Sequence, residues 1–135
     1  MSTPRKVGQL VLLLQGLLVG GWALIGPRSF YDDFPGFGHH WTAPTGPYNE
    51  HFVTDVGAAY LALAALALLA LAWGDLRSCR LAAAAWVVFS APHFLFHARH
   101  LSGLTSFDKV AELGSLGGTL VLAIWLVTPG RGADR

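Results

Sequence analysis

The sequence predicts an all-α fold: a polytopic membrane protein whose four transmembrane helices form an up-down bundle with an ordered outer loop, in a single membrane domain over residues 1–135. Only 13% of the residues are charged and 53% are hydrophobic, whereas soluble domains carry about 25% charged residues. Four stretches contain no Asp, Glu, Lys or Arg: residues 7–27, 56–74, 81–98 and 113–130. A helix needs about 20 mainly apolar residues to cross a hydrocarbon core of about 30 Å. These observations exclude the soluble globular class.

The uncharged stretches predict helices at about residues 7–26, 51–73, 81–99 and 109–128, because lipid leaves no partner for the backbone amides of a single strand. After the first helix, the sequence from Pro27 to Phe30 has no A-x-A cleavage pattern, which favours a retained helix over a signal peptide. In the third helix, Pro92 removes one backbone hydrogen bond and predicts a kink beside His93.

Two pairs of glycines have the GxxxG spacing that allows helices to approach closely in lipid: Gly16 with Gly20 and Gly114 with Gly118. We expect both pairs to pack within the bundle. A homo-oligomer formed through one of these faces is the alternative.

Basic residues predict the orientation of the chain in the membrane. One side collects Arg5, Lys6, Arg77, Arg80, Arg131 and Arg135, and the other has Arg28, Arg99 and Lys109. Because cytoplasmic loops are richer in Lys and Arg, this split predicts a multi-pass protein of the cytoplasmic (inner) membrane with both termini in the cytoplasm. The 27–50 loop and the 100–108 turn then face outward.

Several classes of function find no motif in the sequence. The net charge is +1 and the sequence has no run of basic residues, so no electrostatic attraction to nucleic acid is expected. Neither of the Gly-rich nucleotide-binding loops occurs, so no nucleotide cofactor is expected. The one cysteine, Cys79, allows no internal disulfide and no Cys-based zinc pattern.

The titratable residues are concentrated in the predicted outer half of the bundle. His51 with Asp55 starts the second helix at i, i+4 spacing, His93 with His97 repeats this spacing in the third, and Glu112 lies near the start of the fourth. Since these helix ends lie at one depth in an up-down bundle, we expect the five side chains to line one polar pocket below the outer loop. Ionisable residues inside a membrane are costly and usually face the bundle interior.

A second set of polar residues surrounds this cluster and is predicted to handle protons or to support the five residues through hydrogen bonds. Its members on the helices and the outer turn are Glu50, His100 and Asp108; those on the outer loop are Asp32, Asp33, His39 and His40. The loop is rich in aromatic and proline residues, which predicts an ordered cap and not a flexible linker.

Two interpretations of the cluster stay open. In the first, His51, Asp55, His93, His97 and Glu112 bind a transition metal (Fe, Mn, Zn or Cu(II)), since imidazole with carboxylate suits these ions. The protein is then a membrane oxidoreductase or a subunit of a membrane redox system. In the second, the same residues form a structural hydrogen-bond network in a non-catalytic membrane subunit or small-ligand-binding bundle. Haem bound by two histidines is a further alternative that the spacing does not select.

The segment from Arg28 to Gly57 resembles the DoxX-like small four-helix membrane proteins. The resemblance lies in the FYDDFPGF loop and in Tyr48-Asn49-Glu50-His51 followed by Asp55-Val56-Gly57. It implies a four-helix bundle and a link to membrane redox chemistry, including a redox partner or a quinone, and it assigns no catalytic residue.

Overall fold

The computed structural model describes residues 1–129, and Arg131, Asp134 and Arg135 lie outside these residues. The chain forms four long helices, α1 (Thr3–Ile25), α3 (Glu50–Trp73), α4 (Leu76–Arg99) and α5 (Ser106–Val127). All four are long and apolar enough to cross a membrane. Between α1 and α3 lie a short helix α2 (Pro27–Asp33), strands β1 (Pro35–Gly36) and β2 (His39–His40), and one 3-10 turn η1 (Ala43–Thr45). The prediction of an all-α membrane bundle is confirmed.

Polar side chains cap the starts of three long helices. The side chains of Asn49, Asp75 and Thr105 accept hydrogen bonds from the backbone amides of Phe52, Ser78 and Asp108 respectively. Such caps satisfy amides that have no partner within the helix. The cap at Asp75 corrects one boundary, because the third long helix begins at Leu76 and not near residue 81. The loop before it is left with Gly74 and Asp75, and Gly74 adopts the left-handed backbone (φ 70°) that ends α3.

Helices α1 and α3 approach most closely where glycines face the neighbouring backbone. A Cβ atom on Gly20 would lie 2.8 Å from the carbonyl oxygen of Gly57, and one on Gly16 would lie 2.8 Å from the Cβ of Ala64. The expected packing of this pair within the bundle is therefore confirmed. The expectation for Gly114 and Gly118 is wrong: a Cβ on either would meet no atom within 4 Å, because the inward side of α5 is formed by other residues.

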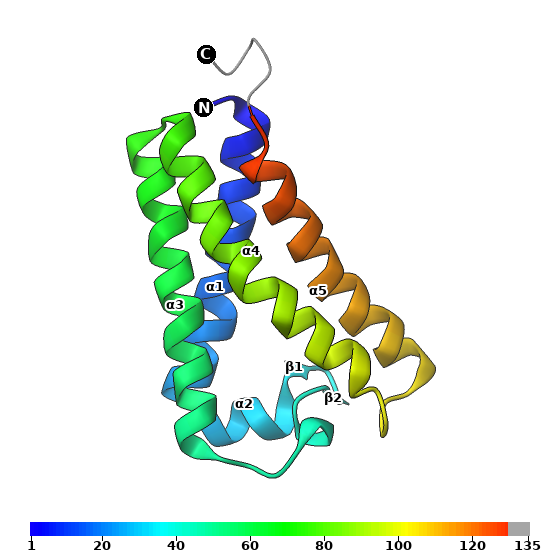
Figure 1. Cartoon of the computed structure of the whole chain (residues 1–135). Coiled ribbons are helices and arrows are strands. Elements are labelled where there is room, and N and C mark those ends of the chain that lie inside the picture. Colours follow the sequence, from blue (N-terminus) through cyan, green and yellow to red (C-terminus); the bar gives the residue numbers. More distant parts are fainter. Residues whose placement is uncertain (130–135) are drawn as a thin grey trace.

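The four helices group into two pairs that diverge toward the α2 end. Figure 1 shows α1 with α3 and α4 with α5 meeting near the N-terminus and separating where α2 and the strands lie. At the closed end, Arg5 is buried and donates to the carbonyl oxygen of Leu126 (2.9 Å). Buried Gln9 donates from Nε2 to the carbonyl oxygen of Cys79 (2.9 Å). These two bonds hold α1 against α5 and α4 at the closed end of the bundle.

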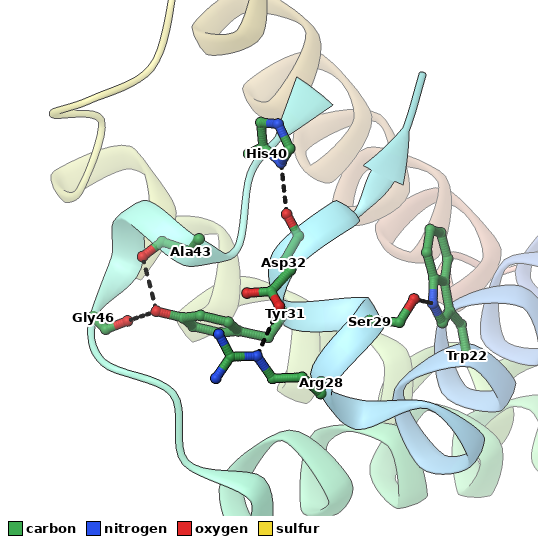
Figure 2. Close-up of polar contacts among 8 residues, drawn as sticks. All are labelled: Trp22, Arg28, Ser29, Tyr31, Asp32, His40, Ala43 and Gly46. Atoms are coloured by element: carbon green, nitrogen blue, oxygen red, sulfur yellow. Dashed lines mark hydrogen bonds and ion pairs between the residues drawn. The ribbon is translucent and has the colours of Figure 1, made fainter. Parts of the chain in front are cut away.

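The segment between α1 and α3 is folded and covers the wide end of the bundle. The Tyr31 hydroxyl donates to the carbonyl oxygens of Ala43 and Gly46, which ties α2 to the turn η1 (Figure 2). Arg28 donates to Asp32 at 2.7 Å, and this bond raises the pKa of Arg28. Strands β1 and β2 pair antiparallel. We call residues 27–49 the roof. Its ordered structure agrees with the prediction from its composition.

Candidate ligand-binding cavity

A cavity of about 600 Å³ lies between the two helix pairs, directly beneath the roof. Its walls are largely apolar and come from all four long helices, for example Leu18 of α1, Val56 of α3, Phe96 of α4 and Leu116 of α5. Small-molecule sites typically measure about 300–1,000 Å³ and combine apolar walls with a few polar groups. The divergence of the helix pairs creates this space, and the roof separates it from the surface above.

The polar end of the cavity is formed by His97 and Glu112. Nδ1 of His97 lies 2.8 Å from Oε1 of Glu112, and the side chains are 15% and 2% exposed. The two atoms are close but not aligned as a hydrogen bond, and the second carboxylate oxygen, Oε2, has no hydrogen-bond partner within residues 1–129. Buried polar atoms are nearly always paired. Glu112 therefore lines the cavity and carries a buried acceptor without a partner.

His93 lies one turn before His97 and lines the same cavity. Their ring centroids are 4.7 Å apart, as expected for residues at i, i+4 on one helix face. The ring of His93 also stacks on Phe89 at 5.2 Å and lies edge-on to Tyr60 of α3 at 6.1 Å. Aromatic contacts thus fix its orientation at the wall of the cavity.

A second polar contact joins α1 and α5 at the wall of the cavity. The hydroxyl of Thr119 donates to Oε1 of Gln15 at 2.9 Å, and both residues line the cavity. Gln15 was not among the predicted site residues. Because Gln15 and Glu112 stand on different helices, polar groups face the cavity from more than one side.

Asp108 fastens the roof to the start of α5. Its Oδ1 accepts from the indole Nε1 of Trp41 at 2.9 Å and lies 2.7 Å from Nδ1 of His39. Its Oδ2 accepts from the hydroxyl of Thr105 at 2.7 Å. Trp41 also lines the cavity, so this latch holds an aromatic roof residue over the ligand space. The expected role of His39 and Asp108 in supporting the polar cluster stays a prediction; the structure places them between the roof and the start of α5.

The other members of the expected site lie away from the cavity, and the five-residue pocket must be corrected for His51 and Asp55. These two pair with each other at 3.3 Å on the surface, with side chains 76% and 61% exposed. The inward face of α3 is occupied by Val53, Val56 and Tyr60, which leaves His51 and Asp55 on the opposite side of the helix. Within residues 1–129, no group of three or more His, Cys, Asp or Glu side chains is arranged to bind a metal ion.

The remaining polar residues make local contacts. Asp32 pairs with Arg28, and its carbonyl oxygen lies 2.6 Å from Nδ1 of His40. The imidazole of His100 stacks on Phe96, with ring centroids 4.1 Å apart. Glu50 and Asp33 are exposed. None of these polar side chains lines the cavity.

Comparison with protein-family models, with curated proteins and with solved structures gave no match. The resemblance to the DoxX-like proteins stays a prediction.

Proposed function

We propose that this chain is a multi-pass protein of the cytoplasmic membrane whose outer half binds a small, largely apolar molecule through a hydrogen bond to Glu112. One observation carries the proposal: Glu112 lines a 600 Å³ cavity, and its buried Oε2 has no hydrogen-bond partner among the described residues. Leaving a buried polar group unpaired costs about 1–3 kcal/mol. A ligand that donates a hydrogen bond to Oε2 removes this cost.

The surroundings of Glu112 favour a neutral donor such as a hydroxyl or phenol. An anionic head group would be repelled by the carboxylate in a poorly hydrated site. The ring-lined walls, including Phe34, Trp41 and Phe96, suit an aromatic or otherwise flat apolar body. A quinol belongs to this class, and through it the proposal includes the membrane redox role expected from the DoxX-like resemblance.

The test compares a phenol, which can donate a hydrogen bond, with its methyl ether, which cannot. Purified protein in lipid nanodiscs is titrated with para-nonylphenol and with para-nonylanisole, whose methyl ether cannot donate. We expect the phenol to bind more tightly, and Glu112→Leu to weaken its binding by about tenfold to a hundredfold, the equivalent of roughly 1.4–2.7 kcal/mol. Glu50→Gln, which changes an exposed carboxylate, is the control. Equal binding of the two probes, or no effect of Glu112→Leu, would contradict the proposal.

Metal analysis of the same preparations addresses the other interpretation. His93, His97 and Glu112 are the three expected ligands that line the cavity. Near-stoichiometric Fe, Mn, Zn or Cu that is lost in a His93→Ala/His97→Ala double variant would favour the metal-binding oxidoreductase over the ligand-binding bundle.

A further inference from the structure

The cavity reaches the outer surface of the bundle between α3 and α4. Phe52 of α3 and Phe96 of α4 both line it, yet they are 64% and 46% exposed. Both side chains therefore contact the cavity and the exterior, as does Leu18 of α1, which is 66% exposed. Since these helices cross the membrane, the exterior beside them is lipid and the headgroup region.

An apolar groove continues from this opening along α4. It is lined by Ala85, Val88, Phe89, Pro92 and His93. His93 lines both the groove and the cavity, so the two spaces adjoin. Phe89 packs edge-on against Tyr60 of α3, with ring centroids 4.9 Å apart, which shows that this side of α4 faces α3. The groove therefore lies on the surface of α4 beside α3 and runs toward the middle of the membrane.

The water-facing side of the cavity is covered by the roof. There the roof is held by backbone and side-chain hydrogen bonds, from Tyr31 to Ala43 and Gly46 and from Trp41 to Asp108. The seam at Phe52 and Phe96 is lined by side chains, and aromatic side chains can rotate without breaking hydrogen bonds. Rotation of Phe52 and Phe96 breaks no hydrogen bond, whereas lifting the roof breaks several.

We propose that the cavity takes its ligand sideways from the bilayer through the α3–α4 seam, and that the ligand is a membrane-dissolved amphiphile with a hydroxyl-bearing head at Glu112 and an apolar chain in the groove beside Pro92. The proposal rests on the function proposed above and adds the route and the chain. The head enters past His93, and the chain remains outside the 600 Å³ cavity.

This arrangement makes a specific prediction about chain length. A chain lying in the groove exchanges lipid contacts for protein contacts. Because lipid tails are as apolar as leucine, lengthening the chain should change the binding affinity little. Affinity expressed as mole fraction in the membrane should then be nearly constant for para-butylphenol, para-nonylphenol and para-hexadecylphenol. A closed cavity would instead reject the longest chain. Binding of the short phenols with loss of para-hexadecylphenol would overturn the lateral route and leave the proposed function intact.

The path of the chain can be mapped directly. A para-alkylphenol carrying a diazirine at the end of its chain is photolysed in nanodiscs, and the labelled peptides are identified by mass spectrometry. We expect label on the groove segment 85–92, and we expect Val88→Trp to remove most of it. Val121→Trp is the matched control, because Val88 and Val121 are 75% and 67% exposed and Val121 lines neither space. Label on the roof would refute the route, and so would labelling of the groove that is equal in the two variants. Failure of every phenol to bind would refute the proposed function instead.

Discussion

The close packing of α1 on α3 predicts opposite effects for two neighbouring glycine substitutions. In Gly20→Ala, the new Cβ would lie 2.8 Å from the carbonyl oxygen of Gly57 and 2.9 Å from the amide nitrogen of Leu61. Both are backbone atoms, so the helices must move apart. In Gly21→Ala, the new Cβ meets no atom within 4 Å. The two substitutions therefore differ in packing but share the same gain in helix propensity.

The gain in helix propensity is the same in both variants, so the difference between their free energies of unfolding reports the cost of overpacking alone. Replacing glycine by alanine within a helix stabilises by roughly 0.5–1 kcal/mol, and overpacking costs about 1–3 kcal/mol. Gly21→Ala should be slightly more stable than the wild type, and Gly20→Ala should be about 1–3 kcal/mol less stable than Gly21→Ala. Reversible unfolding in lipid bicelles, followed by steric trapping, measures this difference. Equal free energies of unfolding for the two variants would refute the close approach of α1 and α3, and with it the shape of one cavity wall.

Two further predictions concern the roof and the orientation. Asp108→Asn should weaken the hydrogen bond that holds Trp41, so hydrogen exchange of the backbone amides in residues 34–47 should become faster. Asp33→Asn, at an exposed position, should leave this exchange unchanged. Unchanged exchange in both variants would show that Asp108 does not hold the roof. In a Cys79→Ser background, a membrane-impermeant maleimide applied to intact cells should label the Ser102→Cys variant and not the Arg77→Cys variant. The reverse pattern would invert the predicted orientation. The background substitution removes a native thiol that is fully buried.

The four membrane helices were predictable because the absence of charge over a membrane-spanning length leaves few alternatives in lipid. The start of α4 was not, since the prediction used Arg80 as the boundary of the apolar stretch. Asp75 caps the helix about one and a half turns earlier, which places Arg77 and Arg80 within the first turns of α4. Side chains of this length can extend to the membrane surface, and Arg80 donates to the carbonyl oxygen of Val127 at 2.8 Å.

The candidate site was predictable in part, and the errors have one cause. His93, His97 and Glu112 were placed correctly in a shared pocket because their spacing and depth agreed with the inward faces of α4 and α5. His51 and Asp55 have the same spacing and depth, but the apolar residues Val53 and Val56 occupy the inward side of α3. Comparing each polar pair with the apolar face of its own helix would have excluded them.

The cavity itself could not be read from the sequence, because it arises from how far the two helix pairs diverge and from how the roof covers the gap. Trp41 illustrates the limit. It lies in an aromatic, proline-rich loop, and the structure shows that its indole donates to Asp108, 67 residues away in the sequence, and that its ring lines the cavity. The aromatic content of the loop was the signal available for a lined pocket.

The central claim is that Oε2 of Glu112 accepts a hydrogen bond from the ligand. Glu50 and Glu112 are the two glutamates of the sequence, so a Glu50→Gln protein labelled with ¹³C-glutamate reports on Glu112 alone. Infrared difference spectra in nanodiscs should show a shift of the labelled carboxyl band when para-nonylphenol is added, and no such shift with para-nonylanisole. A band that is unchanged by bound para-nonylphenol would contradict the account.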